Sequence, residues 1–417
     1  MNFLFLTQYF PPEIGAPQTR LIAMSRELVS RGHSVEIVTA LPNYPQGRIF
    51  KDYKGSFYRV DRNEMIVHRV WLYACVGRGF KRILNYVSFS LTCMIGLIRS
   101  QKPDFVFIES PPLFLTVPGI LFARVVGARP IFNVADLWPD SVVDMELMRK
   151  GLLIRLATKL ESWAYRRSVF VIAMTEGIRD SLRYEKGVPE AKLMFLPNGV
   201  DLELYHPRQP DLQLKQRLGL EDKKLILYQG TQGYAHGLEA VMHAAALLRD
   251  DTSIHFLFVG NGSERRELEA VKARLHLANV TFVDFVPLSE LPRFFSIAEC
   301  GLVSLRRNRS FKGARPAKCN PIFASAKPVL FFGEGEGAEL VKQAKAGIVV
   351  PYGDLQGLAD AARYLVHNSS IAAQLGINGR RYAEQHLGWP AVISSWLTEL
   401  LRRSTSRTET PGLARVH

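Results

Sequence analysis

The apolar positions of the chain fall into short runs of strand length, separated by segments with helical periodicity. One such helical segment is 16–32, where Leu21, Met24 and Leu28 recur at helical spacing and Gly32 stands at the expected C-cap. The strands expected in the first half are 2–7, 34–40, 66–72, 105–110, 130–136, 169–175 and 193–199. This alternation predicts a parallel sheet with helices on both faces.

The second half repeats the pattern after a polar, proline-containing stretch at 205–214. Its expected strands are 224–230, 254–260, 280–286, 301–305, 328–332 and 347–351. The chain of 417 residues is long for one core, so two domains are expected. We therefore expect an α/β protein with two doubly wound, Rossmann-like domains facing a cleft. The expected segments are 1–205, 206–387, a C-terminal amphipathic helix at 388–403 and a disordered tail at 404–417.

Composition is ordinary for a globular protein, but the charge balance is basic, with 53 Lys and Arg against 39 Asp and Glu. A basic balance indicates partners rather than fold: nucleic acid, an anionic membrane surface or phosphorylated ligands. The four cysteines form no C-x-x-C pair, which argues against a zinc site or a disulfide framework. The N-terminus lacks a basic segment before its first apolar run, so no signal peptide is expected.

The run 83–98 is uncharged and bracketed by basic residues, yet it falls short of the roughly 20 residues that span a bilayer. A buried helix of the first domain is the expected structure. The surrounding segment 48–102 carries eleven Lys and Arg against three Asp and Glu. Basic and apolar residues together favour a membrane-surface face, and a merely solvated basic face is the alternative.

Glycine-bearing turns follow successive expected strands of the second half. Glycine lets a backbone approach a ligand, and helix N-termini attract anions. The turn at 227–237 precedes a helix, and so does the turn at 258–269, which has G-x-G but no third glycine. In the turn at 333–341, Glu334 and Glu336 would face sugar hydroxyls rather than phosphate. The donor-binding candidates in these turns are Gly230, Gly233, His236, Gly260, Gly262, Arg265, Gly337, Ala338 and Glu339.

A fourth turn, 311–332, combines basic residues with an expected helix that begins at Pro321. Asn320 would be its N-cap and Pro321 its first residue. Lys318 and Arg315 would neutralise a diphosphate beside the helix N-terminus. An ordinary βα loop is the alternative for each turn taken alone. Together the four turns favour a nucleotide diphosphate bound without metal, since no acidic D-x-D pair or metal-ligand spacing is present.

In the first half, Gly15 lies in the loop after the first expected strand and could let a substrate approach. Asp136 and Asp140 follow the strand at 130–136, and either could orient a hydroxyl nucleophile. A helix cap is the competing interpretation for Asp136.

The motifs "SRELVSRGHSVEIVTA", "LPNGVDLELYHP", "YQGTQGYAHGLEAVMHAAALL", "FVGNGSERRELE", "AKPVLFFGEGEGAELV" and "AGIVVPYGDLQGLADA" occur in an order that resembles family 4 of the retaining glycosyltransferases, which have the GT-B fold. The resemblance runs from residue 2 to about residue 400. The subgroup it suggests is that of bacterial O-antigen and capsule enzymes that transfer amino sugars such as N-acetyl-fucosamine.

This resemblance implies a retaining, metal-independent transfer, with no cofactor, from a nucleotide-sugar donor such as a UDP-sugar to a polyprenyl-diphosphate-linked saccharide. It implies that the second domain binds the donor, that Lys318 is the phosphate-binding lysine, and that Asn198–Asp201 is the inter-domain signature. Lys318 and Asp136 are the expected catalytic residues, and Gly15 and Asp140 the expected acceptor-binding ones. The final helix would return to the first domain, and the enzyme would lie on the inner face of the bacterial cytoplasmic membrane.

The sequence departs from the family pattern at the expected donor site. Lys312 and Pro321 stand where the family has two glutamates, one of which holds the ribose hydroxyls. Ala317 and Ala326 replace a serine and a glycine, and Ala135 stands where the family often has a histidine before the first-domain aspartate. Glu339 and Asn320 are the nearest replacements for the ribose contact.

Three hypotheses follow. The first is an active glycosyltransferase with an altered donor site. The second is a GT-B protein that has lost catalysis and serves as a binding or scaffold subunit. The third is a nucleic-acid-binding protein, suggested by charge alone, because no nucleic-acid-binding motif is present.

Overall fold

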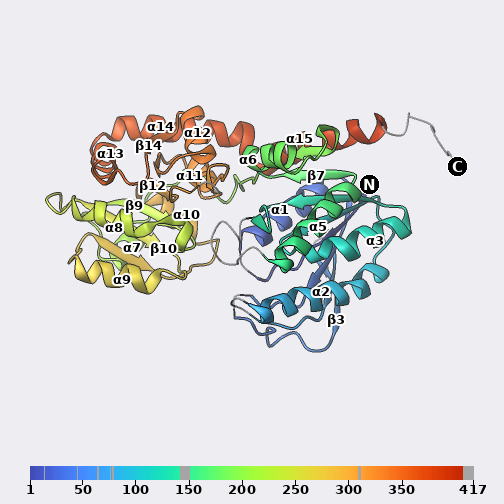
Figure 1. The fold of residues 1–417 in the computed structure, drawn as a ribbon. Coiled ribbons are helices and arrows are strands. Elements are labelled where there is room, and N and C mark those ends of the chain that lie inside the picture. The colour runs from blue at the N-terminus through green and yellow to red at the C-terminus, as the bar shows by residue number, and fades with distance from the viewer. Residues whose placement is uncertain are drawn as a thin grey trace. The chain divides into compact units, whose positions relative to one another are not determined.

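The computed structural model describes residues 1–13, 15–44, 46–62, 65–75, 77, 79–140, 151–308 and 311–406. The chain forms two compact units. Unit 1 comprises Met1–Asn198 together with Val392–His417, and unit 2 comprises Gly199–Ala391. Each unit is built on its own sheet, as the alternation of strands and helices predicts (Figure 1).

Unit 1 contains, among its described residues, an eight-stranded sheet in the order β3-β4-β2-β1-β5-β6-β7-β8. Its strands are β1 (Asn2–Leu6), β2 (Ser34–Ala40), β3 (Phe57–Arg62), β4 (Met65–Val70), β5 (Phe105–Ser110), β6 (Arg129–Val134), β7 (Phe170–Ala173) and β8 (Leu193–Phe195). Its helices are α1 (Ala16–Ser30), α2 (Phe80–Arg99), η1 (Leu113–Leu115), α3 (Thr116–Val126), α5 (Leu152–Arg167), α6 (Glu176–Asp180), η2 (Ser181–Glu185), η3 (Glu190–Lys192) and α15 (Trp389–Ser406).

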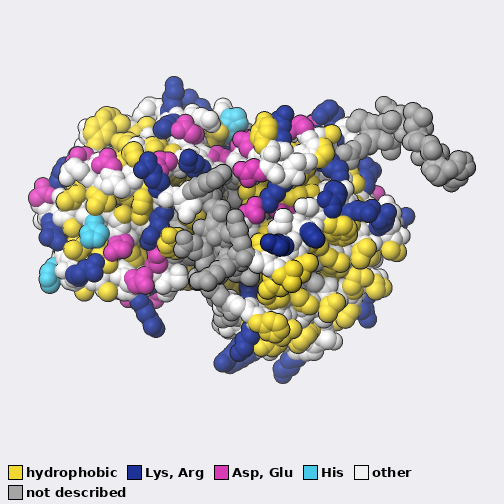
Figure 2. All heavy atoms as spheres, in the orientation of Figure 1, with side chains coloured by type: hydrophobic (Ala, Val, Ile, Leu, Met, Phe, Trp, Pro, Cys, Tyr) yellow, Lys and Arg dark blue, Asp and Glu magenta, His cyan; other side chains and the backbone are white. Residues whose placement is uncertain are grey.

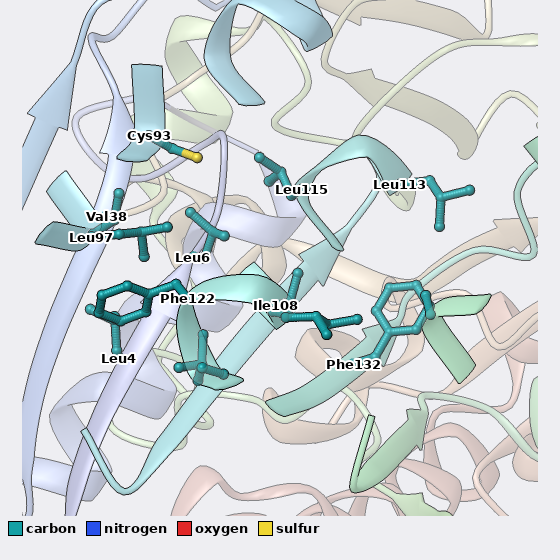
Figure 3. Packing of buried hydrophobic residues seen from close by; sticks show 14 of the residues in the cluster. Leu4, Leu6, Val38, Cys93, Leu97, Ile108, Leu113, Leu115, Phe122 and Phe132 are labelled. Atoms are coloured by element: carbon teal, nitrogen blue, oxygen red, sulfur yellow. The ribbon is translucent and has the colours of Figure 1, made fainter. Parts of the chain in front are cut away.

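The two faces of β1 illustrate why the central strands are almost wholly apolar. Leu4 and Leu6 point to one face, where they join the core formed with α2 and α3 (Figure 3). Phe3 points to the other face, where its ring lies 6.0 Å from that of Trp396 on α15. Both faces of a parallel sheet are covered, so the four positions of β1 after Asn2 are all buried. The final helix thus packs on unit 1 from Val392 onwards, and it extends to Ser406, into the expected tail; residues 407–417 lie outside the described part.

Strand β3 is absent from the sequence prediction. It pairs antiparallel with β4 at the edge of the sheet, with Phe57 opposite Val70. Its sequence, FYRVDR, mixes charged and apolar residues because an edge strand is partly exposed to solvent. The other expected runs of both halves all form strands.

The apolar run 83–98 lies within α2, as expected of a helix of the first unit. Only one side is buried, however, with Phe89, Cys93 and Leu97 in the core. Figure 3 shows Cys93 and Leu97 among the packed side chains. The opposite side is exposed, so the prediction of a buried helix is correct for one face only. No described helix is both long enough and apolar enough to span a bilayer.

Unit 2 contains, in its described part, a six-stranded parallel sheet in the order β11-β10-β9-β12-β13-β14. Its strands are β9 (Lys224–Gln229), β10 (Ile254–Val259), β11 (Val280–Val283), β12 (Ala298–Ser304), β13 (Val329–Phe332) and β14 (Gly347–Val350). Its helices are α7 (Leu212–Arg217), η4 (Tyr234–His236), α8 (Leu238–Ala246), α9 (Arg265–Arg274), α10 (Leu291–Ser296), α11 (Cys319–Ala324), α12 (Glu336–Gln343), α13 (Leu355–His367), α14 (Ser369–Tyr382) and η6 (Ala383–Leu387).

Alternate residues of the β9 strand serve two separate cores. Leu225 and Leu227 join one cluster, with α11, while Ile226 and Tyr228 join the other, with α8 and α13. Because all the strands are parallel, their carboxyl ends lie at one edge of the sheet. The glycine-bearing turns after β9, β10 and β13 therefore meet at that edge, together with the loop after β12.

Candidate active site

Lys318 joins two of the predicted turns. It immediately precedes α11 and is half-buried. Its ammonium Nζ lies 3.3 Å from Nε2 of His236 and 5.4 Å from the ring centroid of Tyr228. Its stem packs on Gly230, where an added Cβ would lie 3.1 Å from Lys318 Cε. The turn after β9 and the loop before α11 are thus in contact through Lys318.

The positive charge of the Lys318 ammonium has no paired carboxylate among the described residues. None of the described carboxylates forms an ion pair with Lys318, and burial lowers its pKa from 10.5 to about 8. The ammonium form still predominates at neutral pH. A half-buried cation without a counter-ion is a suitable partner for an anionic group of a ligand.

His236 is held as a neutral imidazole. Burial, and then the charge of Lys318, lowers its pKa to about 3. Its Nδ1 lies 3.3 Å from the carbonyl oxygen of Ser304, which can only accept, so Nδ1 carries the proton. The lone pair of Nε2 then faces Lys318. Ser304 also donates its hydroxyl to the carbonyl oxygen of His236 at 2.6 Å. His236 of η4 is therefore anchored to Ser304 at the end of β12, and from this fixed position it orients Lys318.

The two glycines of the G-x-G motif after β10, Gly260 and Gly262, are required by close packing against a neighbouring turn. A Cβ on Gly260 would lie 2.2 Å from the carbonyl oxygen of Gly230, and a Cβ on Gly262 would lie 2.2 Å from that of Gln232. The backbone N–H of Gln232 donates to Asn261 at 3.0 Å, so the turns after β9 and β10 run side by side. Gly233 has no such close neighbour.

Arg265 supports these turns. Its guanidinium donates to the carbonyl oxygen of Gly260 at 3.0 Å, pairs with Glu269 at 2.6 Å and stacks on the ring of Phe282. The structure therefore places Arg265 as a residue that positions the Gly260 turn. Its guanidinium also lies 3.9 Å from the carboxylate of Asp284, so it already has four partners within the protein.

Arg306 is a neighbouring residue that the sequence interpretation missed. It follows β12, and its guanidinium lies 4.4 Å from the ring centroid of Tyr234 and 3.3 Å from Glu264. Its backbone N–H donates to Ala235 at 2.9 Å. The basic run after the fourth strand of this half is the signal that could have indicated it.

A cavity of about 220 Å³ lies at the ends of β12 and β13. It is lined by Arg306, Arg307, Asn308, Phe311, Lys312 and Glu334. Glu334 pairs with Arg307 at 3.3 Å and is the carboxylate of this wall. The cavity thus combines cationic groups with one acid.

The turn after β13 is packed onto the loop before α11. The N–H of Glu336 donates to the carbonyl oxygen of Lys312 at 2.8 Å, and a Cβ on Gly337 would lie 2.7 Å from Pro316. Helix α12 begins at Glu336. Ala338 is buried in the core, whereas Glu339 is exposed and pairs with Lys342 at 2.8 Å.

The expected cap of α11 is wrong. The helix begins at Cys319, so Asn320 and Pro321 both lie within its first turn. Proline is tolerated there because the first N–H groups of a helix have no intrahelical acceptor. Asn320 is buried, and its Nδ2 lies 3.5 Å from the carbonyl oxygen of Gly199. Arg315 is half-buried in the preceding loop.

The candidates of unit 1 lie at the ends of β1 and β6. Gly15 precedes α1 in an extended conformation that any residue can adopt. Asp136 is exposed, and its carbonyl oxygen accepts from the N–H of Trp138. Asp140 forms an ion pair with Lys186 at 2.6 Å. Lys186 also binds the buried Glu161, so Asp140 belongs to a charge network.

Unit 1 also holds a buried ion pair that the sequence interpretation missed. Arg20 of α1 pairs with Glu109 at the end of β5 and donates to Asn198 at 3.2 Å. Asn133 of β6 donates to the second oxygen of Glu109 at 2.8 Å. A glutamate at the end of an otherwise apolar strand was the feature of the sequence that could have indicated this ion pair. The cluster fixes α1 and Asn198 to the carboxyl ends of two strands.

Comparisons with known proteins agree with this architecture. Residues 15–199 match the family described as "Glycosyl transferase 4-like domain", and residues 211–382 match "Glycosyl transferases group 1". The chain is 31% identical over 334 residues to the putative colanic acid biosynthesis glycosyl transferase WcaI of Escherichia coli, covering 78% of this chain and 81% of that protein. It is 25% identical to the 2-deoxystreptamine glucosyltransferase of Streptomyces kanamyceticus, covering 89% and 95% of the two chains.

Solved structures share the fold at low sequence identity. The sucrose-phosphate synthase of Thermosynechococcus elongatus superimposes with a TM-score of 0.76 at 17% identity, covering 97% of this chain and 99% of that one. Anabaena HepE, in complex with UDP-glucose, gives a TM-score of 0.72 at 17% identity, covering 96% and 100%. Together with the two matched domains, these relatives establish that the chain belongs to the family 4 glycosyltransferases of the GT-B fold.

Proposed function

We propose that this glycosyltransferase moves an N-acetyl amino sugar from a UDP-sugar to a polyprenyl-diphosphate-linked saccharide during synthesis of a bacterial surface polysaccharide, an O-antigen or capsule. The observation that carries the donor assignment is the half-buried ammonium of Lys318, which no described carboxylate pairs and which lies on the glycine turn after β9. The name of the WcaI relative supports a role in polysaccharide synthesis, and the UDP-glucose complex of HepE supports a UDP-sugar.

Lys318 would stabilise the negative charge that develops on the departing diphosphate. The neutral His236 would act as a positioning residue, since its Nε2 faces the ammonium without competing for the anion. The sugar would be transferred with retention of configuration and without a metal ion. The acceptor hydroxyl attacks on the face that the diphosphate leaves, and a diphosphate oxygen takes the proton of that hydroxyl.

The ribose or sugar hydroxyls need an acceptor, because Lys312 and Pro321 stand in place of the family's glutamates. Glu334 is the residue we propose for this contact, since it lies on the wall of the 220 Å³ cavity. Carboxylate oxygens are strong acceptors for hydroxyl groups. Glu339 is a weaker candidate because it is exposed and does not line this cavity.

The acceptor would bind to unit 1, with Asp136 orienting the hydroxyl that attacks. Exposure of Asp136 at the end of β6 supports this role. Asp140 would contribute less to acceptor binding, because its carboxylate already forms an ion pair with Lys186. The lipid-linked acceptor would place the enzyme at the inner face of the cytoplasmic membrane.

A transfer assay tests the proposal. The purified protein is incubated with a membrane lipid extract and a mixture of UDP-, GDP- and dTDP-sugars, and the lipids are analysed by mass spectrometry. We expect a lipid-linked saccharide heavier by one N-acetylhexosamine or N-acetyl-deoxyhexosamine unit. A product formed from a GDP-sugar would contradict the donor, and no product with any donor would overturn the proposal.

The affinity for UDP should depend on pH through Lys318. The diphosphate favours the ammonium form, whose pKa in the free protein is about 8. Affinity is therefore full below this pKa and falls as pH rises, by up to about ten-fold per pH unit, until the higher pKa of the complex is reached. Calorimetry from about pH 7 to about pH 10 measures this decline. In Lys318→Arg the decline should vanish because the guanidinium stays protonated, and an unchanged profile would contradict the assignment.

A further inference from the structure

Helix α2 has two apolar faces. One packs on the sheet through Phe89, Cys93 and Leu97. The other is open to solvent, with Phe80 at 78%, Leu91 at 70% and Ile98 at 71% exposure. Leu91 and Ile98 follow Leu84 at intervals of seven residues, so they form one stripe along the helix. A surface helix of a protein surrounded by water carries polar residues on its outer side.

The apolar surface continues onto α3 and α5. Leu121 and Val125 of α3 are exposed at 49% and 85%, and Leu152 and Leu153 of α5 at 72% and 60%. Helix α3 packs against both α2 and α5, so the stripes lie side by side. Figure 2 shows hydrophobic side chains gathered over these helices. Extended exposed apolar patches mark interaction sites in soluble proteins. We call this surface the α2–α3–α5 face.

The charges of the α2–α3–α5 face have one sign. Its three helices carry exposed basic residues, namely Lys81, Arg99, Arg124, Arg155, Lys159, Arg166 and Arg167. Glu161 is the sole acid in these helices, and it is buried against Lys186 and Tyr165. Dark-blue Lys and Arg side chains accordingly accompany the apolar area (Figure 2).

The combination of exposed apolar and basic side chains indicates what binds to the α2–α3–α5 face. A second copy docked on the same face would bring two sets of like charges together, which is unfavourable. An anionic bilayer attracts the basic residues electrostatically and accepts the apolar side chains at the boundary of the headgroups and acyl chains. We infer that the α2–α3–α5 face is a membrane-binding surface for anionic lipid. The surface extends beyond the predicted segment 48–102 to α3 and α5, and the inference does not depend on which sugar is transferred.

Vesicle co-sedimentation tests the inference with the full-length protein. We expect binding to vesicles of phosphatidylcholine with phosphatidylglycerol, weakened by salt, and much weaker binding to phosphatidylcholine alone. The double variant Leu91→Glu/Val125→Glu should lower the partition coefficient by about ten-fold or more. Ile377→Glu is the matched control, because Ile377 is 49% exposed on α14 of the other unit. Its binding should equal that of the wild type.

A second measurement covers the case in which the double variant fails to fold. In Leu91→Trp, brominated phosphatidylcholine mixed with phosphatidylglycerol should quench the added tryptophan fluorescence, whereas Ile377→Trp should show no quenching beyond that of the wild type. Equal vesicle binding by the wild type and the folded double variant would overturn the inference. So would dimerisation of the wild type that the double variant abolishes, without vesicle binding. UDP affinity measured on the same variants separates this outcome from a failure of the proposed donor site.

Discussion

Replacing Lys318 by alanine should lower kcat/KM for sugar transfer by about 10²- to 10³-fold, the range found when one preorganised donor to a developing anion is removed. The loss is expected to be large because the ammonium is half-buried and no described carboxylate shares it. Its position is also fixed in advance, by Nε2 of His236 at 3.3 Å and by contact with Gly230. Initial rates at varied donor concentration measure the effect.

Two variants sharpen this experiment. Lys342→Ala removes an exposed lysine of the same unit, which pairs with Glu339, and should change kcat/KM less than about two-fold. Lys318→Arg keeps the charge but not the shape, so it should recover part of the lost rate. If Lys318→Ala and Lys342→Ala have the same effect, Lys318 does not stabilise the leaving group.

Replacing Gly260 by alanine should destabilise unit 2 by about 2 to 4 kcal/mol, which corresponds to a loss of roughly 5 to 10 °C in its melting temperature. The added Cβ would lie 2.2 Å from the carbonyl oxygen of Gly230, an atom of the neighbouring backbone that has no rotamer to change. The φ angle of Gly260 is 131°, a conformation that alanine rarely adopts. Differential scanning calorimetry measures the shift.

Gly233→Ala is the matched control for stability. Gly233 lies in the same pair of turns, but a Cβ there would be 3.6 Å from its nearest neighbour, an ordinary contact. Its φ of −138° suits any residue. We expect its melting temperature to stay within about 2 °C of the wild type. Equal shifts for the two variants would show that the close approach of the turns after β9 and β10 contributes little to stability.

Much of the candidate site could be predicted because parallel strands end at one edge of a sheet. The turns that contain Gly230, Gly260 and Lys318 follow separate strands, and the alternation of strands and helices already implies that they meet. Sequence could not distinguish a glycine that approaches a ligand from one that approaches another backbone. The structure shows that Gly260 and Gly262 are needed because each approaches another backbone segment closely.

The side-chain assignments were less predictable because a partner distant in sequence decides whether a charge is available. Arg265 meets the carbonyl of Gly260 and the ring of Phe282, whereas Lys318 meets a neutral imidazole contributed by a different turn. Asn320 was expected as a helix cap, but tertiary packing buries it within the first turn of α11. Contacts between distant residues outweigh the local preference of asparagine for the N-cap position.

The sequence by itself determined the two sheets apart from β3, the order of their other strands along the chain and the family, because apolar periodicity and turn residues are local properties of the chain. Only the tertiary structure decided which faces of those elements are covered. The run 83–98 is uncharged throughout, and its sequence could not tell that α2 buries Phe89 while exposing Leu91. That choice depends on the neighbouring strands and on α3, so the α2–α3–α5 face becomes visible only in the folded protein.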